Sequence, residues 1–468
     1  MIASKSWSIT RSGSGASRCK RTRVRSMCLR NWMPSPAPSE APAPTTQPQT
    51  RARVRLLVAF ASLLYFPILA HHSVRVAWDP QEDFPSFYFA ARAASSGAAS
   101  PYDVDGLTRL AREQGIEQRV YPFLYPPPTL VLFLPFGRLP YRSASLALMV
   151  LNHGALLGSI WLVCRKLLPL GGSEPTALAM FALAYAFSFT PTVQTIDVGQ
   201  TNLLVLACVT GAWIALRDPR RDWLAGALLA IACLLKLYLV LVLVALLLRR
   251  RFRVVAFAAA TAGVFALTSL VALPHSEWME WLVEVAPSGS YGRVPRGLDW
   301  IGIVHPANQA LAGLIARLTA PECPLASLRG LTVPFDYAAA CGCAGAAAWA
   351  LLRARLRPNA ELGAELSLAL LTAYLVAPFS WVHHLVFLWG VGAVSLALAL
   401  ERGSVMSNVT RATIAGSALV WAWDLPLELP LFRRGPWALF SSVKCLAVLS
   451  LWAFSLHRTA YGTGSPRV

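Results

Sequence analysis

The sequence Trp78-Asp-Pro-Gln-Glu-Asp-Phe-Pro-Ser-Phe-Tyr88 closely follows the first long apolar run of the chain, Val54 to Ala70. That run is long enough to cross a bilayer, because a spanning helix needs about 20 residues. Glu82 and Asp83 are therefore expected just outside the hydrocarbon. An acid held at a membrane surface is well placed to take a proton from a bound hydroxyl. The alternative is an ordinary solvated loop acid.

The composition is that of a membrane protein. The chain has 468 residues, of which 56% are hydrophobic and 14% charged, whereas a soluble domain has about 25% charged residues. Apolar runs recur to the end of the chain, so we expect an all-α polytopic membrane protein. The nine cysteines have no metal-binding or disulfide spacing, and we predict no zinc site.

The net charge of +19 is unevenly distributed. Residues 1–55 contain eleven basic residues and one acid, which account for ten of the net positive charges. The other basic clusters flank apolar runs, as the positive-inside rule requires of membrane proteins. The high charge is therefore not interpreted as a nucleic-acid signal.

The chain is expected to comprise a transmembrane domain between two tails. Residues 1–50 are rich in Ser, Arg and Pro, have no apolar period and should be disordered. They are either a polybasic membrane tether or a dispensable tail, and Met33 is a possible true start. Residues 51–460 form the predicted membrane domain, and 461–468 a short C-terminal tail.

Basic clusters placed on the cytoplasmic side give a consistent zigzag of about twelve crossings, with both termini cytoplasmic. The first long outer segment, about 73–142, is expected to hold an interfacial helix over 84–98 and a short apolar piece over 129–136. A second outer segment, 274–332, is expected to hold a helix near 306–319. Lys236 falls at or near an outer turn. The predicted crossings are 54–72, 143–164, 174–192, 200–216, 222–235, 236–248, 252–273, 333–352, 362–379, 383–400, 410–424 and 436–456.

This threading, set by Lys and Arg alone, gathers other polar residues at the outer side. Ionisable groups near membrane depth are costly and usually line a functional cavity. We therefore predict an active cleft open to the exterior. The polar residues that converge there are Asp83, Asp197, Gln200, Asn202, Asp299, His305, Asn308, His383 and His384.

Each of these residues also has a structural interpretation. The segment from Asp197 to Asn202 fits a turn followed by a helix N-cap. His383 and His384 point to different faces of a helix, so at most one should line a shared cleft. Lys236 can either snorkel to the surface or hold a phosphate. His305 and Asn308 can simply start a helix, and His71 and His72 are interpreted as interfacial.

The ordered set of short motifs resembles glycosyltransferase family 87, the polyprenol-phosphate-mannose-dependent mannosyltransferases of the GT-C membrane superfamily. The resemblance covers about residues 54–400. No single motif is specific, but their order matches that of the family. The matching pieces are Asp83-Phe-Pro-Ser-Phe-Tyr-Phe-Ala-Ala91 with Pro101-Tyr-Asp103, Tyr125-Pro-Pro-Pro128 with Leu139-Pro140, Val198-Gly-Gln-Thr-Asn202, Leu234-Leu-Lys236, Asn308-Gln309 and Ser380-Trp-Val-His-His384.

The resemblance implies a GT-C bundle of about twelve transmembrane helices and a sugar donor linked to a polyprenyl phosphate. It implies a catalytic carboxylate in the first outer loop, which maps onto Asp83; the neighbouring Glu82 can be confused with it. Single displacement with one base predicts inversion. The expected substrate-binding residues are Glu82, Tyr88, Arg92, Asp197, Gln200, Asn202, Lys236, His305, Asn308, His383 and His384.

The predicted enzyme acts in the cell membrane, with its active site on the extracytoplasmic side. Its expected partners are a polyprenyl-phosphate sugar, a glycan or glycolipid acceptor and the bilayer. No cofactor is expected, and a metal requirement is left open. Two alternatives remain: a pentosyltransferase of the same architecture, and a multi-pass transporter or lipid flippase, whose site would lie near the midplane between repeats.

Overall fold

The structure, a computed structural model, describes residues 67, 70–76, 79–167, 189–295, 297–298, 302–357, 361–400, 406–427 and 429–462, without the side chains of 400 and 433. The chain comprises two units, Met1–Arg51 and Ala52–Val468, and every described residue belongs to the second. The predicted N-terminal tail, most of the crossing at 54–72, residues 168–188 with most of the crossing at 174–192, Asp299 and residues 463–468 lie outside the described residues.

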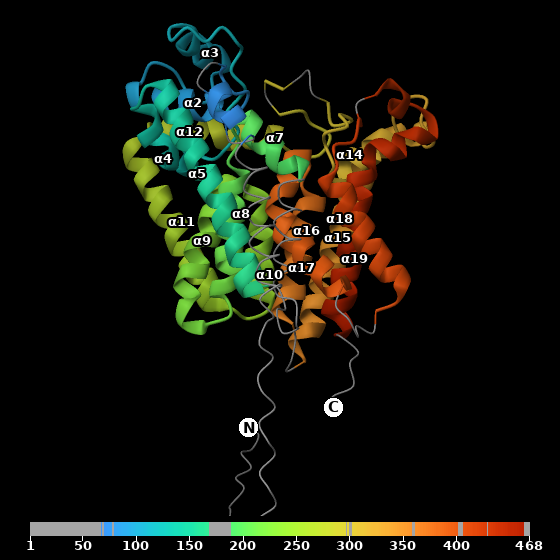
Figure 1. The fold of residues 1–468 in the computed structure, drawn as a ribbon. Coiled ribbons are helices and arrows are strands. Elements are labelled where there is room, and N and C mark those ends of the chain that lie inside the picture. The colour runs from blue at the N-terminus through green and yellow to red at the C-terminus, as the bar shows by residue number, and fades with distance from the viewer. Residues whose placement is uncertain are drawn as a thin grey trace, which may run out of the picture. The chain divides into compact units, whose positions relative to one another are not determined.

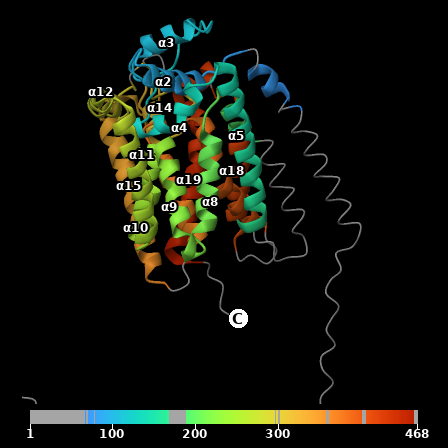
Figure 2. The same cartoon turned by 90° about the vertical axis from the view of Figure 1, so that its left-hand side faces the viewer.

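The described part of the chain is helical and contains no strand apart from an isolated antiparallel bridge between Asn308 and Trp381. Long helices run side by side, and short helices lie across one end of them (Figures 1 and 2). The α-helices are α2 (Phe84–Ser96), α3 (Val104–Arg112), α4 (Pro127–Gly137), α5 (Tyr141–Leu162), α7 (Thr190–Val198), α8 (Asn202–Ala215), α9 (Asp222–Leu235), α10 (Val240–Leu248), α11 (Phe252–Ala272), α12 (His275–Glu280), α13 (Ala286–Ser288), α14 (Leu311–Leu318), α15 (Thr332–Arg355), α16 (Leu362–Val376), α17 (Trp389–Leu400), α18 (Asn408–Ala422) and α19 (Val443–Tyr461).

Shorter 3-10 and π turns join or extend these helices. They are η1 (Val163–Leu167), η2 (Pro219–Arg221), η3 (Leu237–Leu239), η4 (Trp281–Val285), η5 (Ala326–Leu331), η6 (Val382–Leu388), η7 (Pro430–Arg433) and η8 (Gly435–Ser442).

Five helical stretches among the described residues are long and apolar enough to cross a membrane. Each coincides with a crossing predicted from the sequence. Shorter apolar helices occupy the predicted crossings at 200–216, 236–248 and 362–379. The membrane character of the chain is therefore confirmed. The five stretches are Tyr141–Leu167, Phe252–Ala272, Ala326–Arg355, Val382–Ala399 and Gly435–Tyr461.

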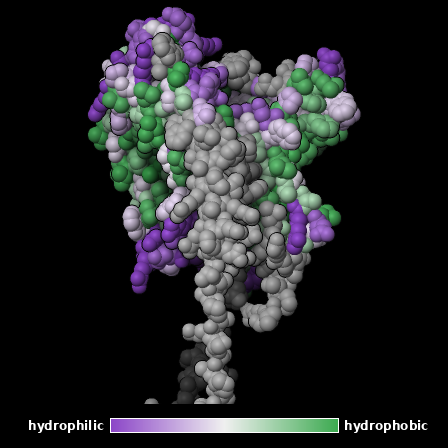
Figure 3. All heavy atoms as spheres, viewed as in Figure 1, coloured by the Kyte–Doolittle hydropathy of each residue, from purple (hydrophilic) through white to green (hydrophobic). Residues whose placement is uncertain are grey.

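The outer faces of these helices are apolar, which suits contact with lipid. On α11, Val264, Leu267 and Val271 have exposed fractions of 62%, 65% and 90%. Such a row of exposed apolar side chains would be unusual on a soluble monomer. Figure 3 shows hydrophobic residues over the middle of the visible helices and hydrophilic residues towards their two ends.

Ion pairs join helix termini at the end of the bundle opposite the short helices. Arg249, after α10, binds Glu365 near the start of α16 at 2.9 Å. Arg253, near the start of α11, lies 4.0 Å from Asp222 at the start of α9. Because α9 starts and α10 ends at this opposite end, the two helices form a short hairpin that turns at Lys236. We call the other end, which carries Asp83 and Lys236, the site end.

The short helices of the site end begin and end at residues that favour those positions. Pro85 and Pro127 lie in the first turns of α2 and α4, where the missing N–H has no helical partner to lose. Gly97 and Gly199 follow α2 and α7 with φ of 66° and 73°, the left-handed conformation that glycine adopts without strain. The chain can therefore reverse direction sharply at Gly199, beside Asp83.

Candidate active site

Asp83 is held at the start of α2 against the end of α7. Its backbone N–H donates to the carbonyl of Val198 at 2.8 Å. Its side chain makes no capping bond to its own helix; instead its Oδ2 accepts a hydrogen bond from Nε2 of Gln200 at 2.9 Å. The carboxylate is thus directed towards the turn between α7 and α8.

The surroundings of Asp83 suit a general base. Burial raises the pKa of this carboxyl to about 6, although the hydrogen bond from Gln200 and the charge of Lys236 act in the opposite direction. The negative charge of Glu82 adds to the increase. A base works best when its pKa lies near the operating pH, and such shifts are typical of functional sites.

A buried cation lies close to this carboxylate. Lys236 has an exposed fraction of 4% and its Nζ lies 2.9 Å from Nε2 of His384 and 3.3 Å from the hydroxyl of Tyr125. As an ammonium, Lys236 has donors only, so Nε2 of His384 is the acceptor. The other ring nitrogen of His384 lies 3.2 Å from the hydroxyl of Tyr238, which fixes the orientation of the ring.

Tyr125 connects the carboxylate and the cation. Besides its contact with Lys236, it interacts with the side chain of Gln200 and with the charge of Asp83. Burial raises the pKa of Tyr125 further above its ordinary value, so it remains a neutral hydroxyl. The five side chains of Asp83, Gln200, Tyr125, Lys236 and His384 form one polar cluster, which we call the central cluster.

Gln81 fixes the position of the segment that carries Asp83. Its Nε2 donates to the carbonyl of Ile196 at 2.9 Å, and its Oε1 accepts from the hydroxyl of Ser145 on α5 at 3.0 Å. Its backbone carbonyl accepts from Gln118 at 2.9 Å. A Cβ on Gly199 would lie 2.7 Å from Oε1 of Gln81, so glycine is needed there for close packing as well as for its φ.

Asn202 and His383 meet beside the central cluster. Nδ2 of Asn202 lies 3.4 Å from the carbonyl of His383, and the hydroxyl of Thr195 donates to the same carbonyl at 3.1 Å. This contact joins α7 and α8 to η6. The rings of His383 and His384 meet edge to face at 4.8 Å, and only His384 contacts Lys236. The structure therefore places His384, of the two predicted histidines, in the central cluster.

Glu82 and Asp197 lie outside the central cluster. Glu82 is exposed and has no hydrogen bond or ion pair within the described ranges. Oδ1 of Asp197 contacts Arg75 at 2.9 Å and His72 at 3.1 Å. Neither of these two predicted substrate-binding acids makes a hydrogen bond to the central cluster within the described ranges.

Tyr88 and Arg92 lie on α2 away from the central cluster. The hydroxyl of Tyr88 donates to the carbonyl of Leu139 at 2.8 Å, and its ring meets those of Phe89 and Tyr141 edge to face. Nη1 of Arg92 lies 3.5 Å from the Tyr88 hydroxyl. These contacts fasten α2 to the start of α5, which is a supporting role.

Asn308 is engaged by backbone on every side. Its Nδ2 donates to the carbonyls of Ile303 and Pro378, both at 3.2 Å. Its Oδ1 accepts from the N–H groups of Ala310 and Ser380, at 3.2 and 3.1 Å. An amide has two donors and an acceptor with two lone pairs, so no position is left for the substrate that was expected to bind Asn308.

His305 belongs to the same scaffold. Its Nδ1 accepts from the N–H of Ala307 at 3.2 Å, and its ring meets Trp381 edge to face. The carbonyls of His305 and Asn308 both accept from Nη1 of Arg317. These bonds fix residues 305–308, and the side chain of Asn308 binds Pro378 and Ser380 just before η6, the turn that carries His384.

Among the residues not predicted from the sequence are the two tyrosines that contact Lys236 and His384. Tyr125 was quoted only as part of a motif, and Tyr238 was not singled out. Tyr238 follows Lys236 by two residues, and Tyr125 begins a run of prolines. The sequence signal that could have identified Tyr238 is its position close to Lys236, the one lysine of the otherwise apolar hairpin of α9 and α10.

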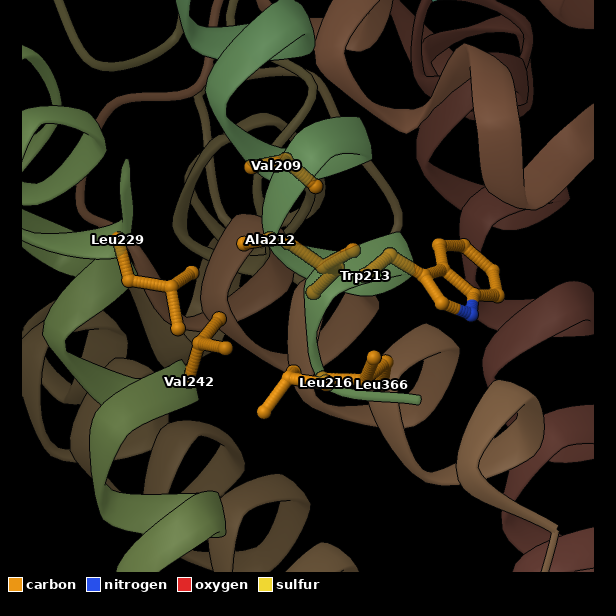
Figure 4. Close-up of a pocket in the computed structure, with 8 residues that line it drawn as sticks. Val209, Ala212, Trp213, Leu216, Leu229, Val242 and Leu366 are labelled. Carbon is orange, nitrogen blue, oxygen red and sulfur yellow. The ribbon is translucent and has the colours of Figure 1, made fainter. Parts of the chain in front are cut away.

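An apolar niche elsewhere in the bundle carries no chemistry. It lies between α8, α9, α10 and α16, and Figure 4 shows Leu229 and Val242 facing the α8 residues Val209 and Ala212. Its lining contains no ionisable side chain. No group of three His, Cys, Asp or Glu side chains suited to a metal occurs in the described part of the chain.

The profile of Glycosyltransferase family 87 matches residues 123–378, more than half of the chain. The chain belongs to this family. It is therefore a glycosyltransferase, and the sequence-based assignment is confirmed. The matched segment of this family 87 enzyme contains Gln200 and Lys236 but neither Asp83 nor His384.

Curated relatives of this family 87 enzyme come from mycobacteria. A polyprenol-phosphate-mannose-dependent alpha-(1-2)-phosphatidylinositol mannoside mannosyltransferase of Mycolicibacterium smegmatis is 32% identical over 319 residues, 64% of this chain and 67% of the relative. The protein of that description from Mycobacterium tuberculosis H37Rv is 28% identical over 324 residues, 66% of this chain and 69% of the relative.

A further relative, from Mycobacterium tuberculosis CDC 1551, is described as a polyprenol-phosphate-mannose-dependent alpha-(1-2)-phosphatidylinositol pentamannoside mannosyltransferase. It is 28% identical over 273 residues, 57% of this chain and 56% of the relative. The chain thus spans between about half and two thirds of the lengths of these relatives.

Proposed function

We propose that this family 87 enzyme transfers mannose from a polyprenyl phosphate to a hydroxyl of a glycolipid acceptor, with inversion at the anomeric carbon. The names of its relatives support the donor, the sugar and a phosphatidylinositol mannoside type of acceptor. The observation that carries the proposal is the central cluster. It sets a carboxylate of raised pKa and a buried lysine within one hydrogen-bonded group.

In the proposed reaction, Asp83 accepts the proton of the acceptor hydroxyl while its oxygen forms a bond to the anomeric carbon. The bond between that carbon and the phosphate oxygen breaks, and the electron pair leaves with the polyprenyl phosphate. Lys236, which His384 holds in position, stabilises the charge that develops on the leaving phosphate. Gln200 holds the carboxylate in position, and no covalent intermediate is needed, so the configuration inverts.

The proposed arrangement in the membrane keeps the threading inferred from the basic clusters. About twelve helices cross the cell membrane, both termini are cytoplasmic, and the site end faces the extracytoplasmic side. Residues 51–460 form the catalytic domain, with tails at 1–50 and 461–468, and α2 to α4 lie at the interface. The helix pairing at Arg249 and Arg253 supports this threading, because it gathers basic residues at the end opposite Asp83.

The test is turnover of polyprenyl-phosphate mannose by purified Asp83→Asn protein. The Asn side chain keeps the size of the original but cannot take a proton, so transfer should fall by at least about 10²-fold while donor binding persists. Glu82→Gln is the matched control, since it removes the adjacent, exposed carboxylate, and it should retain most of the turnover. Near-normal activity of Asp83→Asn would remove the base assignment.

A panel of polyprenyl-phosphate sugars distinguishes the proposal from its alternative. Preference for a pentose donor would identify a pentosyltransferase with the same machinery.

A further inference from the structure

A polar pocket lies at the site end beside α7, the helix whose last residue binds the backbone of Asp83. Its volume is about 340 Å³, at the small end of the roughly 300–1,000 Å³ typical of ligand sites. It contains charged, imidazole and apolar groups. The residues that line it are Pro67, His71, His72, Arg75, Val193 and Asp197.

The polar wall of this pocket is fixed in place yet open to solvent. Oδ1 of Asp197 accepts from Nη1 of Arg75 at 2.9 Å and lies 3.1 Å from Nδ1 of His72. The side chains of Arg75 and Asp197 are 41% and 30% exposed. Both contacts are to Oδ1, and Oδ2 makes no bond within the described residues. The pocket therefore presents ordered hydrogen-bonding groups that have capacity for a ligand.

The polar groups of the pocket suit a polyol, because they include both hydrogen-bond donors and acceptors. Burial raises the pKa of Asp197, but the hydrogen bond from His72 and the charges of His72, Arg75 and His71 together lower it below its ordinary value. Asp197 is therefore ionised, and its carboxylate oxygens are available as hydrogen-bond acceptors. A carboxylate beside a guanidinium and imidazoles offers both acceptors and donors, which the hydroxyls of a sugar can use at once.

The pocket and the central cluster share one corner of the chain. Asp197 is followed by Val198, whose carbonyl accepts from the N–H of Asp83, and by Gln200, whose side chain binds the Asp83 carboxylate. On the pocket side, the hydroxyl of Ser73 contacts the sulfur of Met149 on α5 at 3.7 Å. A glycan with its reacting hydroxyl at Asp83 could thus place another sugar in this neighbouring pocket.

We propose that this pocket is an acceptor subsite, which binds a sugar of the acceptor glycan other than the one that carries the reacting hydroxyl. The proposal rests on the proposed function for the identity of the acceptor. Arg75 and Asp197 hold the hydroxyls of this sugar, and Pro67 and Val193 pack against its C–H groups. The subsite makes the enzyme prefer acceptors with several sugars over acceptors with one.

The kinetic test compares Arg75→Ala with the wild-type enzyme. Two lipid acceptors are used, one that carries a single mannose and one that carries three. Loss of a hydrogen bond to a charged group should raise the KM of the longer acceptor by roughly tenfold or more. The kcat for both acceptors and the KM of the shorter one should be unchanged. Arg253→Gln, which removes an arginine 73% exposed at the opposite end of the bundle, is the matched control.

A binding test separates the subsite from the transfer reaction. Saturation-transfer NMR with free mannotriose should detect binding to the unchanged protein, weakened in Arg75→Ala and in Asp197→Asn. If the enzyme transfers no mannose but mannotriose binds in this way, the proposed function fails and the subsite stands. Equal changes in KM for both acceptors, no change for either, or displacement of mannotriose by inorganic phosphate would overturn the subsite.

Discussion

Replacement of Gln200 by leucine should move the acid limb of the pH profile to higher pH. The Gln200 amide donates to the Asp83 carboxylate at 2.9 Å and so stabilises the charged form. Burial already raises the pKa of Asp83 to about 6 against this hydrogen bond. With the donor removed, the contributions of burial and of Glu82 remain, and the pKa must rise further.

The size of the shift follows from the strength of the bond. A hydrogen bond to a charged group contributes about 1.5–3 kcal/mol, and one pKa unit corresponds to about 1.4 kcal/mol. Asp83 is only partly covered, so water replaces some of the lost stabilisation. We therefore expect an increase of about one unit, at the lower end of that range.

The assay measures kcat/KM for mannose transfer between pH 5 and 9. This range includes the acid limb of the pH profile for both the wild-type and the Gln200→Leu enzyme. Below the pKa, Asp83 is protonated and cannot act as a base, so kcat/KM should fall tenfold per pH unit. The unchanged enzyme should lose half of its plateau value near pH 6, and the Gln200→Leu enzyme near pH 7. The plateau value of kcat/KM at high pH should fall less than the value near pH 6, because the Asp83 carboxylate is intact in the variant.

Glu82→Gln provides a control of opposite sign. Its negative charge raises the pKa of Asp83, so its removal should move the acid limb to slightly lower pH, and the effect should shrink in high salt because Glu82 is exposed. An acid limb that stays in place in Gln200→Leu, or moves to lower pH, would refute the view that Asp83 titrates and that Gln200 stabilises its charge.

Three further predictions concern stability, measured as unfolding in detergent. The folded pKa of Asp83, about 6, exceeds its ordinary 3.8. The ionised carboxylate therefore destabilises the folded state increasingly as the pH rises from about 4 through 6. Asp83→Asn should be more stable than the wild-type protein by about 1–2 kcal/mol at pH 8, but not at pH 4. Gly199→Ala should lose about 1–2 kcal/mol of folding stability and much of its activity, because φ at this position is 73° and the new Cβ would lie 2.7 Å from Oε1 of Gln81. The control is Gly158→Ala, whose new Cβ would have no atom within 4 Å. Its stability should be equal to or higher than that of the wild-type protein. Asn308→Ala should lose about 2–5 kcal/mol of folding stability, because buried backbone groups are left without hydrogen-bond partners. The KM of both substrates should be unchanged in the folded fraction. A raised KM would instead support a substrate-binding role for Asn308.

Much of the scaffold could be predicted from the sequence because it depends on local order along the chain. Runs of apolar residues bounded by arginines indicate helices in a bilayer, and the predicted crossings at 252–273 and 333–352 match α11 and α15 closely. The sharp corner before α8 was indicated by Gly199 and its polar neighbours. Such features rest on residue type and spacing, which need no knowledge of what packs against them.

The roles of individual polar residues could not be predicted in that way. Asn308 and Gln200 are both amides next to predicted helices, yet one is used up by backbone and the other binds a carboxylate. Whether an amide has spare hydrogen-bonding capacity depends on its neighbours from distant segments. His383 and His384 likewise differ only in which of them the turn η6 directs towards Lys236.

The sequence by itself determined that the chain is a helical membrane protein with an acid, a lysine and paired histidines at helix ends. Only the tertiary structure decided that Gln200 meets Asp83 across 117 residues and that Lys236 meets His384 across 148. The physical reason is that buried polar groups must find partners, and packing between helices determines which partners come within hydrogen-bonding distance.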